Sequence, residues 1–170
     1  ALATSVWGDP GETEGSALAP ALRIAWARRL ADQLPELASW ARGMAAVVVA
    51  REQFCFGRSP TTPTRRAVDR LLGRAWHDAA TISAFTGRLS NAASWPLRGI
   101  DSPAELWRAE LAVVGRVATD ATDRVSKPGY DRATVAALMA LQLVDLWRVL
   151  AVIEVAGRHP VPTEVFDALV

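Results

Sequence analysis

Residues 102–125, SPAELWRAELAVVGRVATDATDRV, decide the fold class of this chain. Ser102 suits a helix N-cap, Pro103 suits the first turn, and Glu105 follows the cap by three residues, which is the capping-box pattern. Apolar side chains then recur in alternating steps of four and three: Trp107, Leu111, Val114, Ala118, Ala121 and Val125. Such spacing is typical of a seam that packs against another helix. The stretch therefore predicts a long helix with a helical neighbour.

Helical patterns continue upstream of this stretch. Apolar residues recur every four positions along residues 18–34, at Leu18, Leu22, Trp26, Leu30 and Leu34. Pro35 can open a second helix, which Gly57 is placed to end. A third helix is expected from Thr62, with Val68, Leu71 and Leu72 inside. Residues 75–101 carry Asn, Pro and Gly at short intervals, which predicts short helical pieces and turns.

Downstream, Asp131 can cap a helix that runs to about residue 156 and is apolar almost all round. A narrow polar stripe of Gln142, Asp145 and Arg148 interrupts it, so we expect this helix to lie centrally in a bundle. No stretch alternates apolar and polar residues as a half-buried strand would. The predicted fold class is all-α.

Composition limits the function classes. The chain has 170 residues, of which 51% are hydrophobic and 22% charged, with a net charge of +1. This balance argues against disorder and against a dedicated nucleic-acid binder, which carries a strong basic excess. The longest uncharged run, residues 133–144, is shorter than the roughly 20 residues of a membrane-spanning helix, and no signal peptide is visible. We expect a soluble protein without a membrane span.

Two similar helix ends suggest an internal repeat. Residues 49–60 and 149–160 share Val, Gly, Arg and Pro at identical spacing. This similarity predicts two diverged helical modules, residues 1–60 and 102–170, separated by short intervening helices in residues 61–101. The alternative is that two unrelated helices end in the same Gly/Pro signal, which is common.

The usual catalytic residues are scarce. One cysteine excludes an intramolecular disulfide and a multi-cysteine zinc site; Cys55, between two phenylalanines, is interpreted as a small buried hydrophobe. His77 and Asp78 could act as a base with an orienting carboxylate, but no nucleophile lies at a recognisable motif. Asp120 and Asp123 share a helix face and could hold a hard cation, but no further carboxylates lie nearby in the sequence. The sequence therefore predicts no catalytic, cofactor-binding or metal-binding residues.

An arginine face offers a different kind of site. Four residues are expected to form it on the outer side of the third helix: Arg65, Arg66, Arg70 and Arg74. Such a face can meet an acidic partner or anionic lipid headgroups, although an ordinary solvated helix face has the same composition. We treat these four arginines as a candidate interface.

Several segments resemble the C subunit of the V-type (archaeal/vacuolar-type) rotary ATPases, which is named the d subunit in eukaryotic complexes. They are most similar to the C-terminal half of bacterial versions, and they comprise residues 7–11, 24–29, 49–52, 102–110, 147–149 and 164–168. The resemblance implies a fold of repeated three-helix units forming a socket. It also implies a non-catalytic role on the cytoplasmic face of the membrane, between the central rotor shaft and the proteolipid ring.

The resemblance further implies that the partners are other rotary-ATPase subunits, and that membrane association occurs only through them. It carries over no individual contact residue, because the Asn-Leu-Arg run of many family members is absent from the corresponding helices. This chain would then be a portion of a longer subunit.

Two alternatives stay open. One is a helical small-molecule-binding regulatory domain, which an enclosed pocket lined by Trp and Phe would favour. The other is a helical enzyme built around His77 or around Asp120 and Asp123. An open concave face bordered by Arg would favour the socket.

Overall fold

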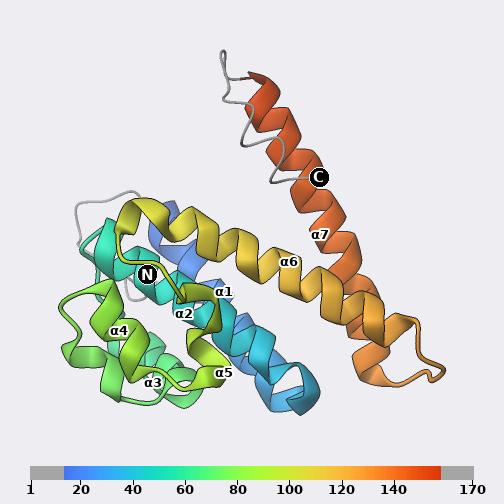
Figure 1. The fold of residues 1–170 in the computed structure, drawn as a ribbon. Coiled ribbons are helices and arrows are strands. Elements are labelled where there is room, and N and C mark those ends of the chain that lie inside the picture. The colour runs from blue at the N-terminus through green and yellow to red at the C-terminus, as the bar shows by residue number, and fades with distance from the viewer. Residues whose placement is uncertain (1–13, 158–170) are drawn as a thin grey trace. The chain divides into compact units, whose positions relative to one another are not determined.

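The computed structural model describes residues 14–157, which form helices and turns without a β-strand (Figure 1). The all-α prediction is confirmed for this part of the chain. The α-helices are α1 (Glu14–Gln33), α2 (Ala38–Cys55), α3 (Thr62–Leu72), α4 (Ile82–Arg88), α5 (Asn91–Ser94), α6 (Leu106–Val125) and α7 (Arg132–Gly157). Short 3-10 turns connect several of them: η1 (Pro35–Leu37), η2 (Ala75–Asp78), η3 (Trp95–Leu97) and η4 (Pro103–Glu105).

The chain divides into two compact units, residues 1–113 and 114–170, with the boundary inside α6. The predicted modules, 1–60 and 102–170, have different limits. The repeat itself stays a prediction, and residues 158–160 of its second copy lie outside the described residues. Where the copies can be compared, Val49 is fully buried, whereas its counterpart Val149 is 55% exposed. Shared helix-end spacing therefore does not bring shared packing.

Helix α2 is the centre of the first unit. α1, α3, α5 and η3 all pack against it, and it is buried along most of its length. Small side chains make up much of the buried surface: Ala38, Ala41, Gly43, Ala45, Ala46 and Ala50. Because small residues let helix axes approach closely, neighbours can surround α2 on several sides. The sequence predicted that a helix at residues 131–156 would be the central one. In the first unit the enclosed helix is α2.

The packing face of α1 differs from the predicted stripe. Ala21, Ile24 and Ala27 face the core and are at most 8% exposed, whereas Leu22 and Trp26 of the stripe are 59% and 56% exposed. Alanines on the inner face bring α1 close to α2, and this leaves the bulkier Leu and Trp side chains on the outer face. The four-residue periodicity identified the helix correctly. Its first three members, Leu18, Leu22 and Trp26, are exposed, whereas Leu30 packs against the core.

The short segments after α3 close the first unit around Phe85, which is fully buried. Phe54 and Trp76 meet its ring edge-on, with centroids 5.8 and 6.4 Å away.

The expected capping box before α6 is only partly formed. The Ser102 hydroxyl accepts a hydrogen bond from the Ala104 N–H at 3.3 Å, while the Glu105 carboxylate accepts from the Asp101 N–H rather than from that of Ser102. Residues 103–105 form the 3-10 turn η4, and α6 begins after this turn, at Leu106.

The second unit consists of the end of α6, a turn, and α7. Asp131 caps α7, as predicted: its Oδ1 accepts from the Thr134 N–H at 2.7 Å and from the Thr134 hydroxyl at 2.9 Å. These hydrogen bonds, followed by the nearby Arg124, lower the pKa of Asp131. The cap and the ion pair with Arg124, at 3.0 Å, fix where α7 begins.

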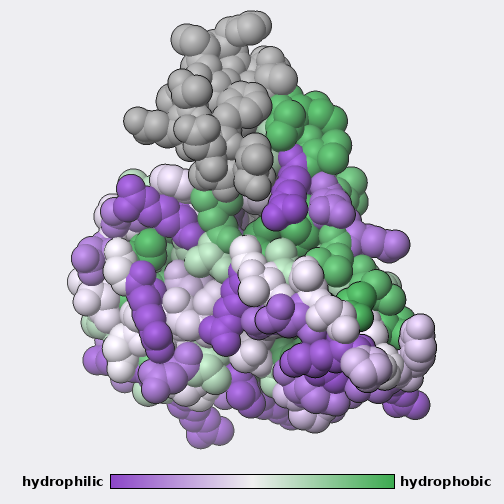
Figure 2. Space-filling view, turned by 45° about the vertical axis from the view of Figure 1, so that its right-hand side comes forward, coloured by the Kyte–Doolittle hydropathy of each residue, from purple (hydrophilic) through white to green (hydrophobic). Residues whose placement is uncertain are grey.

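The prediction that α7 is a central helix is wrong. Its buried residues are confined to the side that carries Ala133, Thr134, Ala137 and Val144. Most of its large apolar side chains are exposed, and they form the hydrophobic surface along this helix in Figure 2. Composition alone does not distinguish a helix enclosed by its own chain from one that exposes its apolar side chains.

Helix α7 is also long and apolar enough to cross a membrane. The stretch Arg132–Ile153 has 22 residues, and an 18-residue window within it has a mean hydropathy of 1.8 with 11% of that window buried. Asp145 and Arg148 interrupt this stretch, so its longest uncharged run, residues 133–144, is shorter than a membrane span. Length and composition alone do not decide whether the expectation of no membrane span holds, and it stays a prediction.

The contact of Gly43 with Trp95 provides a test of how tightly α2 is packed. A Cβ on Gly43 would lie 2.5 Å from the Trp95 ring, while one on Gly115 in α6 would meet nothing within 4 Å. We expect Gly43→Ala to lower the free energy of unfolding by about 1–3 kcal/mol through overpacking. The matched control, Gly115→Ala, should raise it by about 0.5–1 kcal/mol because a helix interior favours Ala over Gly. Urea denaturation measures both, and an equal effect of the two changes would contradict this packing.

Candidate functional site

An open groove of 520 Å³ lies on the first unit between α1 and α3. Its lining combines aliphatic side chains with arginines. From α1 come Leu18, Ala21, Leu22, Ile24, Ala25 and Arg28, and from α3 come Pro63, Thr64, Arg66, Ala67 and Arg70. Both sets follow helical spacing, so each helix contributes one continuous face to the groove.

The positions of the small residues explain the hollow. Ala25 on α1 and Ala67 on α3 do not fill the space between the two helices, while Leu18 and Leu22 stand beside it. Leu18 and Leu22 are 41% and 59% exposed. The groove thus offers a half-exposed apolar surface that side chains of this unit leave open.

Positive charge borders the groove. Arg28 pairs with Asp32, four residues on, at 3.6 Å. Arg66 and Arg70 are exposed and form no ion pair with another described residue. Guanidinium groups bind carboxylates through paired, charge-assisted hydrogen bonds, so this border is suited to an acidic partner.

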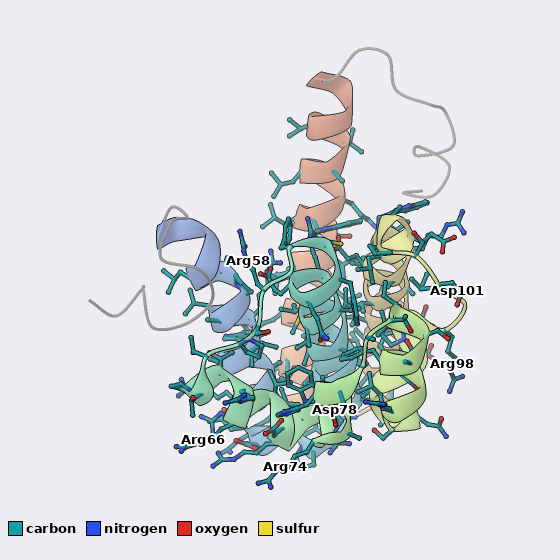
Figure 3. All side chains as sticks on the ribbon, turned by 90° about the vertical axis from the view of Figure 1, so that its left-hand side faces the viewer. Arg58, Arg66, Arg74, Asp78, Arg98 and Asp101 are labelled. Atoms are coloured by element: carbon teal, nitrogen blue, oxygen red, sulfur yellow. The ribbon has the colours of Figure 1, made fainter. Side chains whose placement is uncertain are left out.

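The four predicted interface arginines do not share one surface. Arg66 and Arg70 line the groove, whereas Arg65 lies one helical step away and outside it. Arg74 follows Gly73, which ends α3 with a φ of 84°. Figure 3 shows Arg66 and Arg74 both pointing outward from different parts of this segment. The sequence predicted a charged segment, and in the structure only two of its four arginines, Arg66 and Arg70, line the groove.

A charged cluster at the end of α2 was not predicted. Arg51 pairs with Glu110 of α6, and Glu52 pairs with Arg58 at 3.4 Å. The Arg58 guanidinium also lies 4.9 Å from the centre of the Phe56 ring. The cluster attaches the end of α2 to α6 and to the turn after α2. The sequence signal for it was weak, because Arg and Glu within one helical turn usually lie on a solvated surface.

Glu52 is the buried member of this cluster, with a relative exposure of 6%. Burial raises the pKa of its carboxyl, although the charges of Arg51 and Arg23 act in the opposite direction. A carboxylate placed in this environment gives up much of its hydration, and nearby arginines replace only part of it. We interpret Glu52 as a structural group that joins α2 to its surroundings.

His77 does not pair with Asp78. Its Nε2 lies 2.6 Å from Oδ1 of Asp69 on α3, and the indole N–H of Trp76 donates to the same oxygen at 3.2 Å. The imidazole ring also lies against the Trp76 ring, with centroids 4.3 Å apart. These contacts fasten η2 to α3, which gives His77 a role in packing.

The remaining titratable candidates are dispersed. Cys55 is exposed, so its interpretation as a buried hydrophobe is wrong; its thiol lies 3.7 Å from the Pro103 carbonyl oxygen, and partial burial raises its pKa. Asp120 pairs with Arg116 at 3.4 Å. Within residues 14–157, no group of three or more His, Cys, Asp or Glu side chains is placed to hold a metal ion.

Comparisons of the chain with protein-family models, with curated proteins and with solved structures find no match.

The raised pKa of Glu52 predicts a specific pH dependence of stability. In the unfolded chain the Glu52 carboxyl loses its proton near pH 4.5, whereas in the folded protein it keeps the proton to a higher pH. The contribution of Glu52 to the free energy of unfolding therefore falls as pH rises through the folded pKa. Glu52→Gln removes the titration. The stability of the wild type relative to this variant should therefore be greatest in acid and decline toward neutral pH.

Urea unfolding of both proteins at a series of pH values measures this difference. Parallel curves for wild type and Glu52→Gln would show that Glu52 titrates alike in the folded and unfolded chains. A difference that grows toward neutral pH would mean that ion pairing outweighs burial and that the assigned direction is wrong.

Proposed function

We propose that this chain is a non-catalytic coupling subunit, or a portion of one, of a V-type rotary ATPase. In this role it links the central rotor shaft to the membrane proteolipid ring, on the cytoplasmic face of the membrane. ATP hydrolysis and ion movement then belong to other subunits. The observation that carries the proposal is the open, arginine-bordered groove between α1 and α3 on an all-helical body, taken together with the sequence resemblance.

Two segments that carry the resemblance lie next to each other in the first unit. Residues 49–52 are at the end of α2, and residues 102–110 include η4 and the start of α6. The Arg51–Glu110 ion pair joins them, and the Cys55 thiol lies near the Pro103 carbonyl in the same region. Their proximity supports the view that these segments belong to one structural element. Two other resembling segments, residues 7–11 and 164–168, lie outside the described residues.

The shape of the groove favours a protein partner. An enclosed pocket lined by aromatic rings would suit a small molecule, but this groove is open and its lining consists of aliphatic side chains and arginines. Aliphatic surface beside guanidinium groups is complementary to an amphipathic helix with acidic residues on one flank. A protein that joins two parts of an assembly needs such a surface, and so the groove supports the socket over the regulatory domain.

A coupling role also places a mechanical demand on the body that carries the groove. An element that transmits torque must keep its shape under load, and a closely packed core resists deformation. α2 meets this demand through its surrounding contacts with α1, α3, α5 and η3. The groove helices α1 and α3 both pack on α2, so a force applied at the groove passes directly into the core.

Co-purification from the source organism tests the proposal. The tagged chain, in detergent-solubilised membranes, should recover the shaft and proteolipid subunits of a V-type ATPase, as identified by mass spectrometry. Replacing the two groove arginines, Arg66→Glu with Arg70→Glu, should reduce that recovery by about tenfold or more, because like charges would then face an acidic partner.

The matched control is Arg65→Glu with Arg74→Glu, which makes the same change of charge outside the groove. It should recover the partners as the wild type does. If the wild type recovers no rotary-ATPase subunit, the proposed function is wrong. An equal loss in both double variants would show that net charge rather than the groove determines binding.

A further inference from the structure

The groove between α1 and α3 carries positive charge that its own walls do not neutralise. Three arginines and no acidic residue line it. Asp69, the acidic residue of α3, is held instead by the His77 imidazole at 2.6 Å and by the Trp76 indole at 3.2 Å. Arg66 and Arg70 are exposed and form no ion pair with another described residue. Two guanidinium groups are therefore available to carboxylates of a partner.

The carboxylates of the second unit are mostly engaged within that unit. Three of its aspartates pair with arginines of the same unit, namely Asp120 with Arg116, Asp131 with Arg124, and Asp145 with Arg148. Drawing one of them to the groove would leave its own arginine without a pair, so the exchange adds no ion pair. The charge of the groove is thus better matched by a separate molecule than by the second unit.

Charge and apolar surface form two rows along the groove. Arg66 and Arg70 are four residues apart on α3, and Leu18 and Leu22 are four residues apart on α1. Four residues advance about 6 Å along a helix, so each row offers two contact points at that spacing. Alanines of both helices also line the groove, and such small side chains let the backbone of a partner approach closely.

A helix matches these two rows. Residues four apart on a helix are neighbours on one face, so one flank can bring two carboxylates to the arginines while the adjacent face covers the leucines. The backbone hydrogen bonds of a helix are internal. An extended segment would need backbone partners from the groove, and both walls are helices whose own backbone groups are bonded within themselves.

An anionic lipid surface matches the rows less well. A headgroup layer is broad and contacts side chains that project, whereas the two rows line a hollow. Arg65 and Arg74 lie outside the groove and are exposed. They would meet a charged surface as readily as Arg66 and Arg70 do, so lipid binding would not single out the groove pair.

We propose that the groove selects an amphipathic helix by a pair of acidic residues four positions apart, which contact Arg66 and Arg70, beside aliphatic residues that cover Leu18 and Leu22. This inference rests on the proposed function in taking the groove as the partner site, and it adds what the site recognises. Binding of a synthetic helix requires no ATPase subunit. The inference and the proposed function can therefore fail separately.

Fluorescence anisotropy with a labelled synthetic peptide measures this recognition on the full chain. The peptide is an alanine-based helix of about 18 residues, long enough to be helical in water, with two glutamates four positions apart and leucines on the adjacent face. The wild type should bind it, and glutamine in place of both glutamates should weaken binding by about tenfold or more. Leu22→Gln should weaken it by about fivefold through lost aliphatic contact.

Charge exchange between protein and peptide gives the sharpest comparison. Arg66→Glu with Arg70→Glu should lose the glutamate peptide and bind a peptide with lysines at the same two positions. The matched control, Arg65→Glu with Arg74→Glu, makes the same change of net charge outside the groove and should keep the wild-type preference. All four arginines are exposed, so circular dichroism should show unchanged helix content.

Three results would overturn the proposal. The wild type could bind no glutamate peptide, which would show that the groove does not take an acidic helix. Both double variants could lose the peptide equally, which would show that net charge determines binding. Finally, the wild type could float with phosphatidylglycerol vesicles through Arg66 and Arg70 without binding the peptide, which would identify anionic lipid as the occupant.

Discussion

The close packing around α2 is the constraint on which the first unit depends. A helix can be surrounded on several sides only where its side chains are short enough for neighbouring backbones to approach. Gly43 supplies the closest approach, against the Trp95 ring, and the Trp95 indole donates a hydrogen bond to the Ser39 carbonyl at 3.3 Å. Both α1 and α3 take their positions from α2. The groove between them is therefore a consequence of how α2 is packed.

The end of α2 shows a second physical balance. Burying the Glu52 carboxylate removes it from water, and Arg58, Arg51 and Arg23 restore part of the lost stabilisation. Breaking such an arrangement by removing one partner leaves an uncompensated charge, which costs more than the pair itself contributes. The cluster therefore gives the α2–α6 junction a defined geometry.

Each of the two units has exposed apolar side chains on a long helix. On the first unit they belong to the outer face of α1, where Leu22 and Trp26 are more than half exposed. On the second they belong to α7, where Leu143, Leu146 and Leu150 are more than half exposed. In each case the apolar row follows one face of a long helix, the pattern that pairs with another helix.

The sequence by itself determined the helices and many of their ends, because those depend on neighbouring residues. Gly57 and Gly73 have positive φ where helices end, and Asp131 caps α7 through Thr134, three residues away. The inner face of α3 was also predictable, since its apolar residues stand out among its arginines. Local chemistry of this kind is readable without knowledge of the fold.

Only the tertiary structure decided which helix is enclosed and which residues share a surface. α2 and α7 are both apolar, yet Val49 is fully buried and Val149 is 55% exposed. Arginines from both α1 and α3 line the groove. The imidazole of His77 pairs with Asp69 rather than with Asp78. These outcomes depend on residues far apart in the chain approaching one another, and burial is a property of that approach. Periodicity within one helix cannot specify it, because the neighbours that exclude water lie elsewhere in the sequence.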